Sequence, residues 1–148
     1  MDDTRQTALG RLLEVVALLG DDMADWLDRV GLSRARAQLL WVLGSHGAVT
    51  QRALADTLRV TPRNVTGLVD RLQSDGLVAR RPHPLDRRAS LVELTAHGRD
   101  IVADLQRQHA ELADLLFAGL PERSVTEFGS ALSHVATVIW ERLAEAQP

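Results

Sequence analysis

The feature that most restricts the fold is a pair of short helical patterns between residues 50 and 72, joined by a three-residue break and followed at once by two β-type runs. The second helix is expected to start at Thr61-Pro62, because a cap residue followed by proline at the first helical position favours a helix start. The runs 77–81 and 90–94 predict a hairpin. This order is typical of a helix-turn-helix followed by a β-hairpin wing.

Longer apolar patterns with helical spacing flank this centre. Ser33 and Thr95 are expected to cap two of these helices, Thr50 is expected to cap the first central helix, and residues 45–47 are expected to form a loop. The outer helices are expected to cover residues 7–30, 33–44, 95–120 and 121–146. We therefore predict a mainly α fold with a small β-hairpin wing. Its winged helix-turn-helix lobe (32–98) lies between an N-terminal dimerisation helix (1–31) and C-terminal dimerisation helices (99–148).

Charge is distributed unevenly along the 148 residues. The whole chain has a formal net charge of −3, and all 17 of its basic residues are Arg. Residues 50–99 contain nine Arg and five acidic residues, a net +4, whereas the remainder carries −7. A basic centre between acidic ends indicates a nucleic-acid partner for the centre.

The polar face of the second central helix supplies candidate base contacts. At about 100° per residue its apolar side chains share one face, so its polar side chains point away from the core. Arg63 and Asn64 are residue types that pair bidentately with guanine and adenine, and Thr66 can meet a thymine methyl or a phosphate. Gly67 costs roughly 1 kcal/mol in a helix against Ala, which favours a role in close approach to the groove. The candidate DNA contacts of this helix are Thr61, Arg63, Asn64, Thr66, Gly67 and Arg71.

The segment between the two β-type runs supplies a second set of contacts. Four arginines lie within nine residues at the end of the first run and in this segment: Arg80, Arg81, Arg87 and Arg88. An arginine at a hairpin tip can enter the narrow minor groove, so Arg87 and Arg88 are candidate DNA contacts. Asp86 is interpreted as a residue that orients Arg88, because a bare carboxylate would repel phosphate. For the hairpin, the alternative is a charged turn that only keeps the protein soluble. For the second central helix, the alternative is that its polar residues are simply solvated on the surface.

Together these pieces resemble the MarR family of winged-helix transcriptional regulators. The resemblance rests on residues 53–72, on 75–80, on the wing Asp86-Arg87-Arg88 and on the run through Leu94-Thr95 to Gly98. It extends over nearly the whole chain once the long terminal helices are included. It implies a homodimer with interlocked terminal helices whose two lobes straddle a pseudo-palindromic operator, usually as a repressor.

The resemblance also implies a dimer interface and an effector. Family members often release DNA when a small, frequently aromatic or phenolic anion binds between the dimer helices and the lobe. Trp26, Trp41 and His46 are the candidates for that pocket, with core packing as the alternative for each Trp. The expected interface residues are Leu9, Leu12, Val16, Val125, Phe128, Leu132, Val135 and Ile139. The last five step by three and four, as in a coiled-coil seam, although this face could instead fold back on the subunit's own first helix.

Other classes of protein fit the sequence poorly. It contains no Cys, no common catalytic motif and no metal-type spacing among its five His, so we expect no metal, no cofactor and no enzyme. No apolar run approaches the roughly 18 residues of a membrane span, and the acidic start does not suit a signal peptide, so a cytoplasmic location is expected. We predict a sequence-specific regulator that binds double-stranded DNA. The alternative is a winged-helix module for protein contacts alone, such as an antirepressor, which would not require such concentrated charge.

Overall fold

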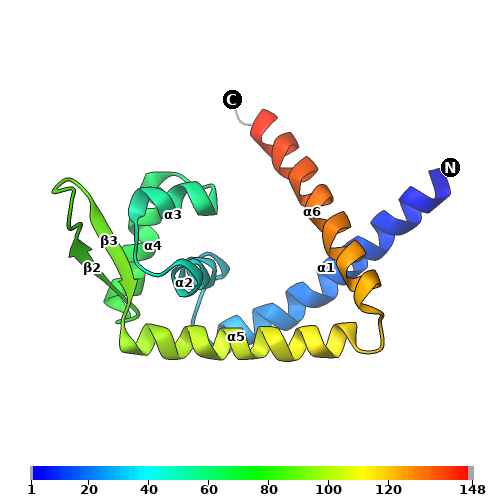
Figure 1. Ribbon diagram of the computed structural model, residues 1–148, viewed down its shortest axis with the longest axis horizontal. Helices are drawn as coiled ribbons and strands as arrows, with labels where there is room; N and C mark the ends of the chain where they lie inside the picture. Colours follow the sequence, from blue (N-terminus) through cyan, green and yellow to red (C-terminus); the bar gives the residue numbers. More distant parts are fainter. Residues whose placement is uncertain (1, 147–148) are drawn as a thin grey trace. The chain divides into compact units, whose positions relative to one another are not determined.

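The computed structural model describes residues 2–146 and divides into two compact units, one extending to Leu105 and one beginning at Gln106 (Figure 1). The first unit contains α1 (Asp2–Val30), α2 (Arg34–His46), β1 (Val49–Thr50), α3 (Gln51–Leu58), α4 (Pro62–Ser74), β2 (Val78–Pro82) and β3 (Ser90–Leu94). The helix α5 (Ala96–Phe117) begins in the first unit and ends in the second, which also contains α6 (Glu122–Glu145). This confirms the predicted mainly α fold with a hairpin wing. The functional division at residues 31 and 98 stays a prediction.

The expected helix starts are confirmed by their hydrogen bonds. The side chains of Ser33, Thr50, Thr61 and Thr95 each accept a hydrogen bond from the backbone N–H three residues later, at 3.0–3.3 Å. Each bond satisfies one of the backbone donors that a helix leaves free in its first turn. The cap residues therefore place the starts of α2, α3, α4 and α5 where the sequence analysis expected them.

Three details differ from the expectations. Helix α1 begins at Asp2, earlier than expected, and α2 continues through Ser45 and His46, so the predicted loop is wrong at these two residues. The helix ends instead at Gly47, whose φ of 76° suits glycine. The two-residue strand β1 was not predicted at all. It exists only through pairing with β3, Val49 opposite Val92, and so short a strand has no periodic signal of its own.

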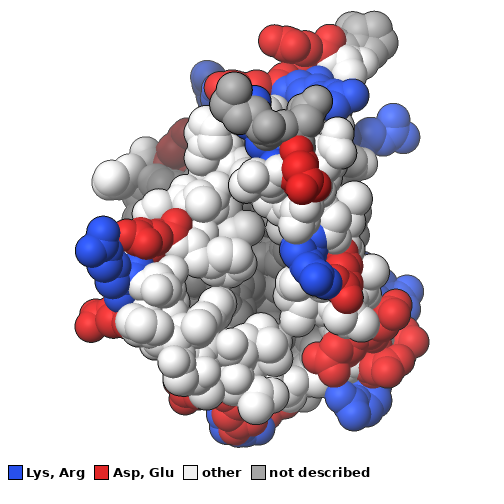
Figure 2. All heavy atoms as spheres, turned by 90° about the vertical axis from the view of Figure 1, so that its right-hand side faces the viewer, with Lys and Arg blue, Asp and Glu red and all other residues white. Residues whose placement is uncertain are grey.

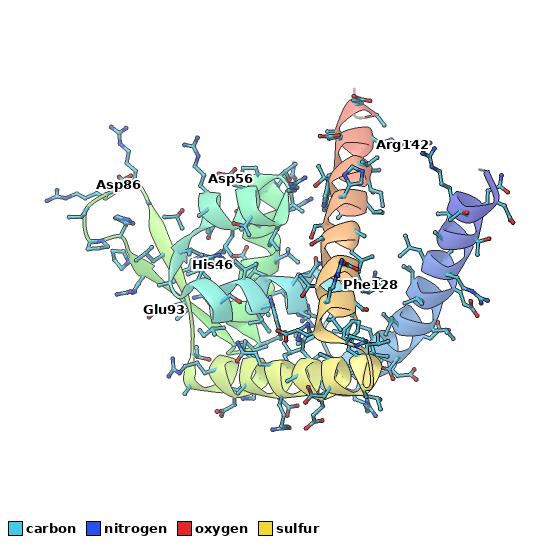
Figure 3. All side chains as sticks on the ribbon, turned by 45° about the vertical axis from the view of Figure 1, so that its right-hand side comes forward. His46, Asp56, Asp86, Glu93, Phe128 and Arg142 are labelled. Atoms are coloured by element: carbon cyan, nitrogen blue, oxygen red, sulfur yellow. The ribbon has the colours of Figure 1, made fainter. Side chains whose placement is uncertain are left out.

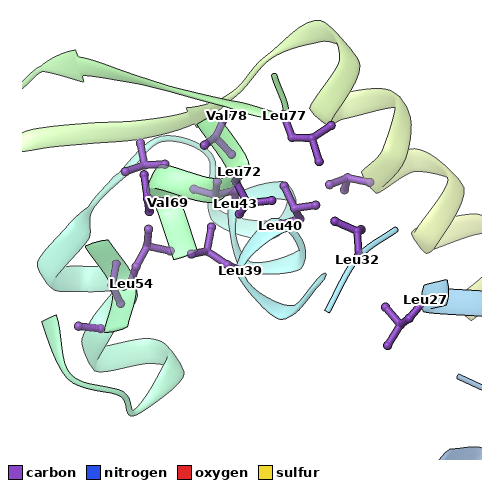
Figure 4. Packing of buried hydrophobic residues seen from close by; sticks show 14 residues of the cluster. Leu27, Leu32, Leu39, Leu40, Leu43, Leu54, Val69, Leu72, Leu77 and Val78 are labelled. Atoms are coloured by element: carbon purple, nitrogen blue, oxygen red, sulfur yellow. The ribbon is translucent and has the colours of Figure 1, made fainter. Parts of the chain in front are cut away.

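The core lies where α2, α3 and α4 meet the sheet, as Figure 4 shows. The fully buried side chains, each exposed by 2% or less, are Leu39, Leu40, Leu43, Leu54, Val65, Val69, Leu72, Val78 and Val92. The residues from α4 form the apolar face that the helical periodicity predicted. Because this face packs inward, the polar face of α4 is left in solvent.

The sheet has the order β1-β3-β2, with antiparallel pairing from Val78 opposite Leu94 to Pro82 opposite Ser90. Its base is tied to α5, since the Thr95 hydroxyl donates to the carbonyl of Gly76 at 2.6 Å. A Cβ on Gly98 would lie 2.0 Å from the backbone oxygen of Leu77, so only glycine fits there. The wing is therefore anchored at its base, and its tip projects away from α3 and α4 (Figure 1).

The terminal helices carry many exposed apolar side chains. On α1, Leu9 is 54% exposed and Val16 is 58% exposed, whereas Leu12 is half-buried. Within the second unit, the rings of Phe117 and Phe128 lie 6.0 Å apart, which packs the end of α5 against the start of α6.

Candidate nucleic-acid interface

Helix α4 presents a polar first turn to solvent. The hydroxyl of Thr61 caps the helix by accepting the N–H of Asn64 at 3.2 Å, and Pro62 occupies the first helical position. Arg63 and Asn64 follow, both exposed, with no acidic residue in this turn. The backbone N–H groups and the positive end of the helix dipole favour a bound anion here. The turn can therefore receive a phosphate while its two long polar side chains reach further.

Arg71 lies at the other end of the same helix. It is eight residues from Arg63, a distance of roughly 12 Å along the axis. Its guanidinium is 3.6 Å from the carboxylate of Asp75, which a second arginine, Arg36, contacts at 2.8 Å. The two predicted contact residues Arg63 and Arg71 therefore lie near opposite ends of α4, and the structure does not bring their side chains together.

The wing contains two kinds of arginine. Arg80 contacts Asp70 at 2.6 Å, and Arg81 contacts Glu93 at 2.9 Å. Both are occupied by intramolecular ion pairs, so counting all four hairpin arginines as a concentration of charge for DNA overstates the free charge. Across residues 2–146, the structure gives the exposed side chains of Arg87 and Arg88 no ion-pair or hydrogen-bond partner. The free positive charge of the wing therefore gathers at its tip.

The tip is ordered by two side chains that accept backbone hydrogen bonds. The Nδ1 atom of His83 accepts from the N–H of Leu85 at 3.1 Å and of Asp86 at 3.0 Å. The carboxylate of Asp86 accepts from the backbone N–H of Arg88 at 2.9 Å. Figure 3 shows Asp86 at the tip and Glu93 nearer the base of the hairpin. Asp86 thus acts on the backbone of Arg88, rather than pairing with its guanidinium.

The sequence pattern did not predict a hydrogen-bonded cluster that joins the polar side of α4 to α3 and β2. Arg80 donates to Gln51 Oε1 at 2.8 Å, Gln73 Oε1 at 2.6 Å and Asp70 Oδ1 at 2.6 Å. Gln51 in turn donates to Thr66 Oγ1 at 3.2 Å. These residues come from α3, α4 and β2, separated by up to 29 positions, so no local spacing could have indicated the cluster.

The structure places the three candidate effector residues in different surroundings, and their shared role stays a prediction. Trp26 packs against the hydrophobic core, as the core alternative expected, and Trp41 is half-buried. His46 is exposed in the last turn of α2, with Nδ1 3.1 Å from the carbonyl oxygen of Val42. A pocket of about 260 Å³ lies elsewhere in the first unit, lined by Val30, Gly31, Leu32, Arg71, Asp75, Leu77, His97 and Ile101.

Two further properties of residues 2–146 concern metal binding and membrane insertion. Within these residues, no three His, Cys, Asp or Glu side chains come together in a way that could hold a metal ion. None of the helices described there combines the length and the apolar character that crossing a bilayer requires.

Comparison with known proteins places these features in a family. The model of the MarR family matches residues 30–89, which contain the helix-turn-helix and most of the hairpin. The chain is 30% identical over 102 residues to the uncharacterized HTH-type transcriptional regulator YfiV of Bacillus subtilis. The matched residues are 68% of this chain and 63% of that protein. The chain matches 56% of the length of three further curated relatives, which are regulators from mycobacteria.

Solved structures extend the likeness to the whole fold. The reduced form of MarR from E. coli is 29% identical, with a TM-score of 0.67 and coverage of 86% of this chain and 95% of that one. FabT of Streptococcus pneumoniae, solved in complex with DNA, has a TM-score of 0.74 at 22% identity, with coverage of 88% and 96%. At this identity, the match to FabT concerns the fold alone.

Proposed function

Because the chain belongs to the MarR family, whose members are DNA-binding regulators rather than enzymes, we propose that it is a transcriptional regulator that recognises a specific sequence in double-stranded DNA. The observation that carries the proposal is the position of its free positive charge. The exposed Arg63 lies in the first turn of α4, and the free Arg87 and Arg88 lie at the tip of the wing of the same lobe. The protein-contact alternative does not explain this placement.

The first turn of α4 is the part proposed to enter the major groove. Recognition helices contact base edges mainly through their N-terminal residues, where this helix has Arg63 and Asn64. Arg63 suits O6 and N7 of guanine, and Asn64 suits N6 and N7 of adenine. The free N–H groups of the turn suit a backbone phosphate, which would set the register of the helix. Gly67, further along α4, would let the helix lie close to the groove.

The wing is proposed to follow the minor groove. The narrow minor groove has a strong negative potential, which attracts an arginine inserted into it. Asp86 holds the backbone of Arg88 through its N–H, so the turn is ordered before DNA binds. An ordered turn loses less conformational entropy on binding, which favours affinity.

Selection of bound fragments from a random-sequence duplex pool tests the proposal. The purified protein should enrich one sequence motif. Its affinity should fall with salt, with a log–log slope near −0.9 for each phosphate neutralised. Arg88→Ala should weaken binding by about 1–3 kcal/mol per half-site. Arg123→Ala is the matched control, since Arg123 pairs with Glu127 on α6, outside the lobe. Failure to enrich any motif would favour the protein-contact alternative.

Base readout has its own test in the same selection. Arg63→Ala and Asn64→Ala should relax the preference at particular base pairs, each by about 1–3 kcal/mol, and should leave other positions of the motif unchanged. If both variants enrich the same motif as the parent protein, the first turn of α4 is not the reading element.

A homodimer on a pseudo-palindromic operator is proposed from the exposed apolar residues of the terminal helices. Leu132 is 36% exposed and Ile139 is 50% exposed, which is unfavourable for apolar side chains in a monomer. Many of the side chains that Figure 2 shows at the surface are uncharged. Two lobes would place their α4 helices in successive major grooves, about 10 bp apart. The sign of regulation is proposed to be repression, to be tested with a reporter gene.

A small aromatic or phenolic anion is the proposed effector. Support comes from the family resemblance together with Trp41, half-buried on α2. Titration with 4-hydroxybenzoate should change the tryptophan emission and release the selected duplex. A Trp41→Phe variant that releases DNA at the same concentration would remove Trp41 from the effector site.

A further inference from the structure

The hydroxyl of Thr66 on α4 is already engaged within the protein. Gln51 Nε2 donates to Thr66 Oγ1 at 3.2 Å, and Thr66 Oγ1 donates to the carbonyl oxygen of Pro62 at 3.0 Å. A threonine hydroxyl has a single proton to donate. That proton is committed to Pro62, although the residue as a whole is exposed on the polar face of α4.

Arg80 determines which way the Gln51 amide faces. Its Nε donates to Gln51 Oε1 at 2.8 Å, and a guanidinium has donors only. The amide oxygen must therefore face Arg80, which leaves the NH₂ group to face Thr66. Arg80 is itself held by Asp70 and Gln73, and its side chain is only 26% exposed. Donor and acceptor roles are thus assigned along the series from Arg80 through Gln51 and Thr66 to Pro62.

We propose that Thr66 recognises a thymine through contact between its methyl group and the C5 methyl of the base. We assign Gln51 and Arg80 as positioning residues for this contact. The inference rests on the proposed DNA binding and adds a base preference to it. A phosphate oxygen only accepts hydrogen bonds, so a phosphate contact would need the hydroxyl proton that Pro62 already receives. The methyl group is the part of Thr66 that remains for an apolar contact with DNA.

Replacement of thymine by uracil tests the proposal directly, because it removes only the C5 methyl. The probe is the duplex enriched from the random pool, with each thymine replaced in turn by deoxyuridine. For the parent protein, one thymine per half-site should matter, with a loss of affinity of about fourfold, as expected for one buried methyl-sized group. Substitution at the other thymines should leave affinity unchanged.

Two variants separate the methyl from the hydroxyl. Thr66→Val replaces the hydroxyl by a second methyl group, and valine has one strongly preferred rotamer in a helix without any hydrogen bond, so it should retain the roughly fourfold preference for thymine without the Gln51 contact. Thr66→Ser keeps the hydroxyl and lacks the methyl, so it should bind both duplexes with the affinity that the parent has for uracil. Thermal unfolding checks that both fold, which is expected because Ser, Thr and Val have similar helix propensities.

A third variant tests the positioning residues. Gln51→Ala should lower the thymine-to-uracil ratio toward one and leave the salt dependence of binding unchanged, a combination that a loss of fold would not produce. Gln51→Ala with the parent ratio would overturn the positioning role.

The remaining outcomes are distinct from one another. Three outcomes would overturn the inference and leave the proposed function intact. They are a thymine preference that Thr66→Ser retains, a thymine preference that Thr66→Val loses, and an enriched motif in which no thymine methyl affects affinity. A parent protein that enriches no motif would overturn the proposed function, and the inference with it.

Discussion

The guanidinium of Arg80, on β2, lies 2.6 Å from the carboxylate of Asp70, on α4, so a charge-assisted hydrogen bond joins the wing to the helix that we propose reads DNA. Asp70 lies on the solvent-facing side of α4, where an unpaired carboxylate would repel the phosphates of a bound duplex. Its pairing with Arg80 offsets that charge and links the two elements proposed to hold DNA. The contact therefore serves both the fold and the electrostatics of the interface.

Loss of the Arg80 contacts should destabilise the lobe. Arg80→Met removes three hydrogen bonds and keeps most of the apolar stem. The free energy of unfolding should fall by about 1–3 kcal/mol, given the partial exposure of the cluster. Arg81→Met is the control, because its ion pair with Glu93 is about half exposed and should be worth less than about 0.5 kcal/mol. Urea denaturation measures the free energy of unfolding of both variants. Equal losses would show that the Arg80 cluster stabilises the lobe no more than the exposed Arg81 ion pair does.

Two glycines should respond to alanine in opposite ways. Gly98→Ala places a Cβ 2.0 Å from the backbone oxygen of Leu77, so the start of α5 must shift and the protein should lose several kcal/mol of stability or fail to fold. Gly67→Ala meets nothing within 4 Å and should stabilise α4 by about 0.4–1 kcal/mol. If Gly67 permits close approach to the groove, the same variant should nevertheless bind the selected duplex more weakly. Unchanged or tighter binding would show that Gly67 has no such role.

The wing tip should depend on an acceptor atom at residue 83. His83→Ala removes the acceptor for two backbone N–H groups, so the amides of Leu85 and Asp86 should exchange faster with solvent. DNA affinity should fall by up to about tenfold, because a loose turn loses more entropy on binding. His83→Asn supplies an amide oxygen near the position of Nδ1 and should restore part of both properties. Amide exchange that is the same in all three proteins would mean that the ring does not order the tip.

The oligomeric state should respond to a charge on α6. Ile139→Glu places a carboxylate in the apolar series of the helix and should convert a dimer into a monomer of 16.3 kDa, as measured by light scattering after gel filtration. Ser130→Glu adds the same charge at an exposed position about half a helical turn away from Leu132 and should leave the dimer intact. A parent protein that is monomeric at all concentrations would contradict the proposed dimer.

The amino-acid sequence by itself determined the starts of α2, α3, α4 and α5, the apolar face of α4 and the family. A cap hydroxyl and its N–H partner are three residues apart, as at Thr61 and Asn64, and an apolar face repeats every three or four residues, so both signals lie within a turn or two of chain. The motif of the wing is likewise contiguous.

Only the tertiary structure decided which polar groups are free for DNA. Arg80 and Arg88 belong to one arginine-rich stretch, yet Arg80 is committed to residues on α3 and α4, and Arg88 is exposed at the tip. The state of the Thr66 hydroxyl likewise depends on Gln51, fifteen positions earlier. The physical reason is that a side chain is paired or free according to which elements pack beside it, and that packing joins segments far apart in the chain.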